Sequence, residues 1–305
     1  MKKQELKSTI LLLITAAIWG FAFVAQRVGT MYVGAFTFNG FRFALGSLSL
    51  VPILIYSNKK SKDSVKDSEE VSSTILGGVI AGTVLFCAAA LQQTGLIYTE
   101  AGKAGFITGL YIVIVPILGL FLKQRVHIST WLGIVLAVFG LYFLSVTEGF
   151  NIAKGDLYVI IGALFWAIHI LVIDYFTKKV DPLKLSFIQF ITCSVLSLVF
   201  ALLFEKISIA SLSMILIPLL YGGILSSGVA YTLQAVAQKH ARPSHAAIAM
   251  STESVFASIG GFLILNENLG FRAYIGCALM LAGMLVSQYE NLKKNKSSAS
   301  EELSS

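Results

Sequence analysis

The chain has 305 residues, of which 56% are apolar and only 13% are charged, and its mean hydropathy is +0.80. Ordinary soluble domains carry about 25% charged residues, so this composition excludes a soluble protein and predicts an integral membrane protein. The formal net charge of +7 does not imply nucleic-acid binding, because basic residues of a membrane protein gather in the loops on one side.

Apolar runs of about 17–25 residues, the length that crosses a hydrocarbon core, follow one another along the whole chain. The first run is too long for a cleaved signal peptide and carries Trp19 and Phe23 near its end, so we take it as an uncleaved span. The sequence predicts an all-α polytopic membrane protein with ten transmembrane helices. In chain order the predicted spans are 8–28, 34–56, 74–97, 101–122, 128–145, 155–176, 183–203, 213–234, 243–265 and 270–289.

Lys and Arg are distributed unequally between alternate loops. With a cytoplasmic N-terminus, the cytoplasmic segments hold 17 of the 23 basic residues and the opposite segments hold 5, while Arg42 lies inside a span. This positive-inside bias predicts that both termini face the cytoplasm, in the plasma or inner membrane of the cell. The polar segments 57–72 and 291–305 have low complexity and are expected to be flexible cytoplasmic segments.

The two halves of the chain show a weak internal repeat. Trp19 and Trp166 lie 147 residues apart, and Gln92 matches Gln234 at an offset of 142. Because each half holds five spans, an odd number, the second half must enter the membrane from the opposite side. The sequence therefore predicts two inverted five-helix repeats with a substrate site near the midplane between them. The repeats are assigned to residues 1–147 and 148–290, followed by a disordered cytoplasmic tail at 291–305.

Four stretches carry a resemblance to a known family: AAIWGFAFVAQRVG near the start, AGKAGFITGLYIVIVPILGLFL from residue 101, LFWAIHILVIDYF from residue 164, and STESVFASIGGFLILNENL from residue 251. From residue 8 to 289 the chain resembles the drug/metabolite transporter superfamily, in the branch with two EamA repeats. This resemblance implies two inverted five-helix bundles around a central cavity, which is lined mainly by the first four spans of each. The Gly-Glu pair that usually closes the fourth and ninth spans reads Lys123-Gln124 and Asn266-Glu267 here, so only the second copy keeps its acid.

Glu253 lies at the centre of the apolar stretch 245–265. A charge at the middle of a span costs about 2.5–3.5 kcal/mol on insertion scales, so buried carboxylates usually mark pathways or proton relays. The small residues on its helix face leave room for a ligand or, alternatively, allow close packing against a helix that hydrogen-bonds a protonated Glu253. We favour the functional interpretation. The equivalent position in the first repeat is Tyr111, near Thr108.

Other polar and aromatic residues inside the spans have two interpretations each. Trp19 and Trp166 form walls of a cavity or pack between helices, and His169, on the same face as Trp166, is a ligand or a core residue. Gln92, Gln93 and Tyr231 offer hydrogen bonds to a substrate or join helices. Arg42 pairs with an anionic substrate or a carboxylate, or extends toward the interface. The predicted substrate-binding or coupling residues are Glu253, His169, Trp166, Trp19, Tyr111, Thr108, Gln92, Gln93, Tyr231 and Arg42.

Several activities are not expected from this chain. Cys87, Cys193 and Cys277 lie in apolar runs without metal-binding spacing, so neither a metal nor a disulfide is expected. There is no phosphate-binding loop, zinc-protease motif or hydrolase elbow, so we expect no enzyme, no cofactor and no primary pump.

The sequence predicts a proton-coupled or facilitative exporter of small polar or amphipathic metabolites, such as amino acids, that works by alternating access. The alternatives are uptake of such a metabolite, or a membrane scaffold or lipid-handling protein that transports nothing. The expected partners are a small-molecule substrate, protons and the lipid bilayer, without nucleic acid, and the expected state is a monomer or weak homodimer.

Overall fold

The computed structural model describes residues 2–60, 68–124, 126–145, 154–266 and 271–287. The predicted tail 291–305, part of the predicted loop 57–72, and Glu267 lie outside the described residues. Within the described ranges the chain is helical and contains no strand. An all-helical fold is what a lipid environment demands of a chain without a closed barrel, since a helix satisfies its own backbone hydrogen bonds.

Seven helices run without interruption: α1 (Lys2–Gly29), α2 (Ala35–Lys60), α3 (Ser68–Gly95), α6 (Ile128–Ser145), α7 (Lys154–Thr177), α8 (Pro182–Phe204) and α14 (Phe271–Ser287). The remaining elements are shorter and follow one another closely: α4 (Ala101–Gly109), α5 (Tyr111–Phe121), α9 (Ile209–Met214), α10 (Leu216–Leu220), the π-helix η1 (Tyr221–Tyr231), α11 (Thr232–Gln238), α12 (Pro243–Ser251) and α13 (Glu253–Leu265).

Eight helical stretches of the described chain are long and apolar enough to cross a membrane. They match the first four predicted spans and the sixth to ninth. The predicted fifth and tenth spans correspond to shorter apolar helices, at Ile128–Phe143 and Tyr274–Ser287. The prediction of a polytopic, all-helical membrane protein is confirmed. The number of ten spans stays a prediction, because two of the ten are shorter than a full crossing.

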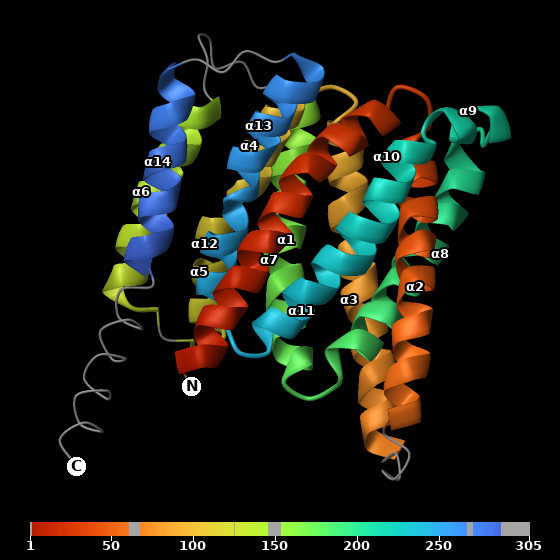
Figure 1. Cartoon of the computed structure of the whole chain (residues 1–305), viewed down its shortest axis with the longest axis horizontal. Coiled ribbons are helices and arrows are strands. Elements are labelled where there is room, and N and C mark those ends of the chain that lie inside the picture. The colour runs from red at the N-terminus through yellow and green to blue at the C-terminus, as the bar shows by residue number, and fades with distance from the viewer. Residues whose placement is uncertain (1, 61–67, 125, 146–153, 267–270, 288–305) are drawn as a thin grey trace.

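The helices lie side by side, most of them steeply inclined in the same sense (Figure 1). The end of the bundle at which α1 begins is termed the proximal end, and the end at which α1 stops at Gly29 is termed the distal end. Helices α6 and α14 pack together at one edge, and α2 packs on α8 near the opposite edge (Figure 1). Between these edges α1 packs on α13 and on η1, and α3 packs on α7 and α8. The middle helices therefore surround the interior that holds the polar residues.

Glycines set the close contact between α6 and α14. A Cβ on Gly133 would lie 2.6 Å from the carbonyl oxygen of Gly283, and one on Gly140 would lie 2.7 Å from that of Gly276. Both distances are too short for any side chain, so only glycine allows the two backbones to approach this closely. Small residues at a helix contact are typical of closely packed membrane helices.

The outer surface of the bundle is more apolar than that of a soluble protein. Large apolar side chains such as Phe121, Leu202 and Leu263 are exposed on the outside of the bundle, whereas Arg42 and Glu253 are buried inside it. A bilayer around the bundle accounts for this pattern, because lipid solvates the outer apolar side chains and polar groups are retained only in the interior.

Candidate functional site

A cavity of about 30 Å³ lies inside the bundle. This space is enough for about two water molecules, whereas pockets that hold metabolites commonly measure about 300–1,000 Å³. In this conformation the walls have therefore closed around a small space. The lining residues come from nearly every helix of the middle of the bundle: Trp19, Phe23, Gln26, Arg42, Gln92, Thr108, Tyr111, Trp166, Ile170, Ser226, Tyr231, Gln234, Met250 and Glu253.

Two of the contributing helices are interrupted beside the cavity. Helix α4 ends at Gly109 and α5 starts at Tyr111, while α12 ends at Ser251 and α13 starts at Glu253. Each interruption contains a tighter hydrogen bond between residues three apart: Val113 N–H to the Leu110 carbonyl at 3.0 Å, and Val255 N–H to the Thr252 carbonyl at 3.0 Å. Interrupted helices near the midplane are typical of substrate and ion sites in membrane transporters.

Local side-chain hydrogen bonds account for the interruption between α12 and α13. The hydroxyl groups of Ser251, Thr252 and Ser254 donate to the backbone carbonyls of the residues three positions earlier, at 2.9, 2.7 and 2.9 Å. Such hydroxyls compete with backbone N–H groups for helical carbonyls and bend or end a helix. The polar cluster around Glu253, which is conspicuous in the sequence, therefore changes the backbone as well as the polarity of this span.

The two interrupted spans contact each other through Tyr111 and Glu253, the first residues of α5 and α13. The Tyr111 hydroxyl donates to Oε1 of Glu253 at 3.0 Å, and both residues are buried and line the cavity. Glu253 is only 3% exposed. The structure thus combines the two interpretations of this residue: Glu253 hydrogen-bonds a neighbouring helix and also faces the cavity. The small residues Ala257 and Gly260 on its helix pack against α1: a Cβ on Gly20 of α1 would lie 2.8 Å from N of Ala257, and one on Gly260 would lie 3.0 Å from Cγ2 of Val24.

Three aromatic rings form one wall of the cavity. The ring centroids of Trp19 and Tyr231 lie 4.5 Å apart, those of Trp166 and Tyr231 lie 6.0 Å apart, and the two tryptophans lie 6.4 Å apart. These distances lie within the range of direct ring contact. The tryptophans that the sequence pairs by the repeat offset are therefore neighbours in space, with Tyr231 between them.

The π-helix η1 supplies Ser226 and Tyr231 to this wall and is bonded to α1 at three points. Trp19 Nε1 donates to the Ser226 carbonyl at 3.2 Å, Thr15 donates to the Ala230 carbonyl at 3.2 Å, and the Tyr221 hydroxyl donates to the Ile18 carbonyl at 3.0 Å. Long π-helical segments are rare and occur mostly at functional sites. Here the π-helix ends at Tyr231, whose ring contacts both tryptophans, and its carbonyls at Ser226 and Ala230 accept hydrogen bonds from α1.

Two glutamines predicted as site residues have different surroundings. Gln92 lines the cavity, and its Nε2 donates to Oγ1 of Thr108, another lining residue, at 3.0 Å. Gln93 is fully buried, and its Nε2 donates to the Gln26 carbonyl at 3.1 Å. Gln93 does not line the cavity, so within the described chain it joins α3 to α1 behind the wall.

His169 also lies behind the wall. It is 0% exposed, its Nε2 is 2.9 Å from Oε1 of Gln189, and its ring meets Trp166 and Tyr231 edge-on at 6.0 and 6.1 Å. It is absent from the cavity lining. The position supports the aromatic wall, and direct contact of His169 with a substrate stays a prediction.

Arg42 is the one cation among the described lining residues. It is 1% exposed, and its guanidinium carbon lies 4.5 Å from the ring centroid of Phe43. Within the described part of the chain its Nε and Nη1 have no hydrogen-bond partner. Arg42 does not extend toward the interface, because its side chain is buried against η1, where a Cβ on Gly222 would lie 3.7 Å from its Cδ.

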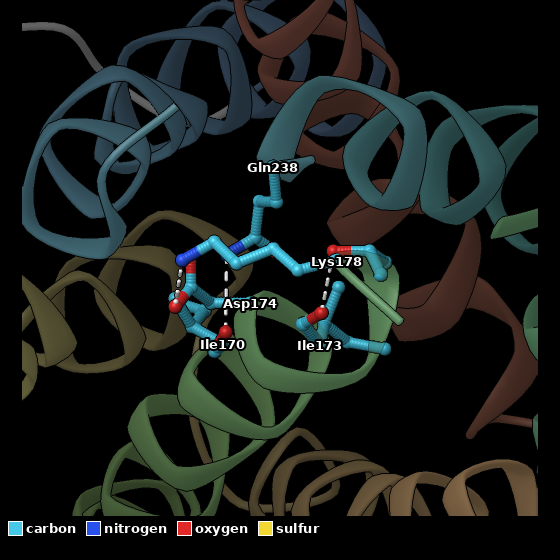
Figure 2. A network of polar contacts seen from close by, with 6 residues as sticks. Ile170, Ile173, Asp174, Lys178 and Gln238 are labelled. Carbon is cyan, nitrogen blue, oxygen red and sulfur yellow. Dashed lines mark hydrogen bonds and ion pairs between the residues drawn. The ribbon is translucent and has the colours of Figure 1, made fainter. Parts of the chain in front are cut away.

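The proximal side of the cavity is held by a polar network at the end of α7 (Figure 2). Nε2 of Gln238 on α11 donates to the carbonyl of Ile170, whose side chain lines the cavity, at 3.0 Å. Lys178, the first residue after α7, forms an ion pair with Asp174 near the end of that helix, at 2.8 Å. Figure 2 shows Gln238 reaching across from α11 to the α7 backbone, so this hydrogen bond fastens α11 beside the cavity.

At the distal end, polar contacts join α1, α3, α4 and α7. Nη1 of Arg27 donates to the carbonyls of Leu96 and Ile97, and Lys103 forms an ion pair with Asp156 at 2.6 Å. These contacts tie the first-half helices α1, α3 and α4 to the start of α7. They connect the helices on the distal side of the cavity.

The structure brings eight of the ten predicted site residues to one cavity: Trp19, Arg42, Gln92, Thr108, Tyr111, Trp166, Tyr231 and Glu253. The lining residues outside the list of ten predicted site residues are Phe23, Gln26, Ile170, Ser226, Gln234 and Met250. Gln234 carried a signal, since it matches Gln92 in the internal repeat. The apolar residues and Ser226 had none, because many residues of the same types lie at other positions of the spans.

This fold and this site define a class of protein: a multi-pass membrane protein that encloses a polar and aromatic cavity between interrupted helices, as membrane transporters do. The chain belongs to the EamA-like transporter family, whose model matches it twice, at residues 6–146 and 153–289. A small-molecule substrate and a lipid environment follow from this membership. The resemblance seen in the sequence is thereby confirmed.

Individual relatives agree with the family. The chain is 31% identical to an "Uncharacterized transporter" of Archaeoglobus fulgidus, over 93% of this chain and 86% of that protein. It is 25% identical to "Uncharacterized transporter YoaV" of Bacillus subtilis, over 89% of this chain and 93% of that protein. A solved structure titled "Crystal structure of protein" shares the fold, with a TM-score of 0.72 and 17% identity over 92% of this chain and 96% of that one.

Proposed function

We propose that the chain is a secondary transporter that exports small polar or amphipathic metabolites, such as amino acids or related compounds, by alternating access. The observation that carries this proposal is the contact between Tyr111 and Glu253, where two interrupted helices meet on the wall of an internal cavity. A carboxylate inside a membrane protein is costly, and such groups face the bundle interior or a water-filled cavity, where they mark substrate pathways and proton relays.

The proposal includes an inverted repeat of two five-helix units, at residues 1–147 and 148–290, with α6 and α14 as the fifth and tenth spans. Two features support it. The interruptions before Tyr111 and Glu253 lie 142 residues apart in sequence. At an offset of 143, Gly133 of α6 corresponds to Gly276 of α14, and Gly140 corresponds to Gly283. The contacts are crosswise between these pairs, since Gly133 meets Gly283 and Gly140 meets Gly276. A two-fold axis produces this reciprocal pattern of contacts.

Transport is expected to run on a gradient, because the sequence contains no nucleotide-binding loop. The closed cavity supports a cycle in which the walls separate on one side of the membrane at a time. Glu253 is the residue proposed to take up and release a coupled proton. The basic residues of alternate loops support a cell-membrane protein with both termini in the cytoplasm, working as a monomer or weak homodimer.

A cysteine-labelling experiment tests transport against the scaffold alternative. In a variant without the three native cysteines, Met250→Cys places a thiol on the cavity wall, whereas Leu263→Cys places one on the exposed outer surface of α13. A charged thiol reagent should modify the Met250 variant as the cavity opens to water and should leave the lipid-facing variant unmodified. A scaffold would protect both positions. Metabolite levels inside and outside overexpressing cells then decide between export and uptake.

A further inference from the structure

The guanidinium of Arg42 has no anionic partner in the described part of the chain, although it is almost completely buried. Arg42 is 1% exposed, and two of its nitrogens have no hydrogen-bond partner there. The one carboxylate among the described lining residues belongs to Glu253, whose Oε1 accepts a hydrogen bond from the Tyr111 hydroxyl. No ion pair joins Arg42 to Glu253 in the described structure.

A packing role does not account for this arrangement. A buried arginine that only stabilises the bundle is normally satisfied by a carboxylate or by carbonyl oxygens, because an unpaired buried charge destabilises the fold. The Tyr231 hydroxyl interacts with the guanidinium, and the ring of Phe43 at 4.5 Å adds a cation–π contact. Neither contact supplies a negative charge, and Nε and Nη1 still have no partner among the described residues. Arg42 lines the cavity, so a ligand bound there can use these unpartnered donors.

A second unpartnered donor lies on the same wall. Nε1 of Trp166 is buried and has no hydrogen-bond partner among the described residues. A guanidinium and an indole N–H only donate hydrogen bonds, whereas an ionised carboxylate only accepts them. Charge-assisted bonds of arginine to a carboxylate are also among the strongest hydrogen bonds in proteins. The donors on the wall therefore match a carboxylate.

The rest of the lining limits the remainder of the ligand. The rings of Trp19, Trp166 and Tyr231 offer a flat apolar surface, which suits a planar or aliphatic body. Glu253 disfavours a second negative group. The unpartnered Oε1 of Gln26, another lining residue, is free to accept one hydrogen bond from the ligand or from water.

We propose that Arg42 binds the carboxylate of the transported substrate, so that the substrate class is small monocarboxylates with an aromatic or other apolar body. This inference rests on the proposed transport function and narrows its substrates. The cavity must widen to admit such a molecule, as it does in the open states of an alternating-access cycle.

A matched pair of probes tests the proposal. Phenylacetate and phenylacetamide have nearly the same shape, but only the acid carries a charge. Both are titrated into the purified full-length protein while the emission of its tryptophans is recorded, since two of the three tryptophans line the cavity. We expect phenylacetate to bind at least about tenfold more tightly than the amide, which corresponds to about 1.4 kcal/mol.

Three variants identify the residue responsible. Arg42→Gln should reduce the preference for the acid to less than about twofold, while Arg42→Lys keeps the charge and should retain part of the preference. Arg272→Gln removes an equal charge from an exposed position on α14 and should leave the preference unchanged. Equal binding of the two probes, no binding of phenylacetate, or full preference in Arg42→Gln would overturn the proposal. Should Arg42→Gln fail to fold, the folded Arg42→Lys protein carries the test: a reduced preference is expected, because lysine lacks the planar fork of donors, and an unchanged preference counts against the proposal.

Exchange of labelled phenylacetate across liposomes separates this proposal from the transport proposal. Binding through Arg42 without any exchange would keep the carboxylate site and refute transport. Exchange of other metabolites without a preference for the acid would keep transport and refute the carboxylate site.

Discussion

Replacement of Glu253 by glutamine separates the charge of this residue from its shape. The amide has the size of the neutral acid, and its oxygen can accept the hydrogen bond that the Tyr111 hydroxyl donates at 3.0 Å. A neutral hydrogen bond inside a protein contributes about 0.5–1.5 kcal/mol, so preserving this bond should limit the loss of stability to about 1 kcal/mol. The variant cannot exchange a proton at this position over the working pH range.

The expected transport result follows from the energy of the proton gradient. A difference of one pH unit is worth about 1.4 kcal/mol per proton, which sustains about a tenfold concentration ratio of substrate when one proton is coupled. In liposomes the wild-type protein should approach this ratio, and Glu253→Gln should remain near a ratio of one. Exchange of substrate at equal pH should survive in the variant, because the loaded protein reorients without net proton movement.

A second carboxylate provides the control. The Glu205 oxygens accept from the backbone N–H groups of Phe36 and Thr37 at 2.9 and 2.8 Å at the distal end of the bundle. Glu205→Gln should lower stability without changing the pH-driven ratio. Undiminished accumulation by Glu253→Gln would refute the coupling role of this residue, and His169 would then be the next candidate.

Three further predictions concern the wall, the scaffold and the topology. Trp166→Ala and Gln92→Ala should each weaken substrate binding about tenfold, while the amount of protein in the membrane stays near normal. If neither variant protein accumulates in the membrane and conservative replacements restore it, these residues are packing elements. Gly133→Val should destabilise the α6–α14 contact by about 1–3 kcal/mol in thermal unfolding. Leu132→Val, on the exposed side of α6, should have little effect. Equal stability of the two variant proteins would contradict the close approach of the helices. Reporter fusions in loop 57–72 and at the C-terminus should report cytoplasm and a fusion at Glu148 the opposite side; termini on different sides would exclude the inverted repeat.

The membrane class and most of the spans could be predicted from the sequence because hydrophobicity is a local property that adds along the chain. A bilayer requires about 20 apolar residues for each crossing helix, and this requirement can be read without knowing which helices are neighbours. The free-energy cost of a polar group in lipid can also be read without knowing its neighbours, so the intramembrane residues Glu253 and Arg42 are candidates from the sequence alone. The short helices α6 and α14 show the limit, since apolar length by itself does not establish a crossing.

The arrangement of the site depended on contacts between residues far apart in the chain. The bond between Tyr111 and Glu253 joins residues 142 positions apart, and no local pattern specifies such a partner. The π-helical form of Tyr221–Tyr231 was likewise not anticipated, because its carbonyls are stabilised by side chains of α1. His169 and Gln93 have the same polarity as the lining residues, yet they lie behind the wall.

What the sequence determined by itself is which residues are costly in lipid and must therefore point inward. Only the tertiary structure decided which of them share a cavity and which satisfy one another behind it. The physical reason is that the transfer of a side chain out of water depends on that side chain alone, whereas packing and hydrogen bonding depend on the shape and polarity of partners that the fold supplies.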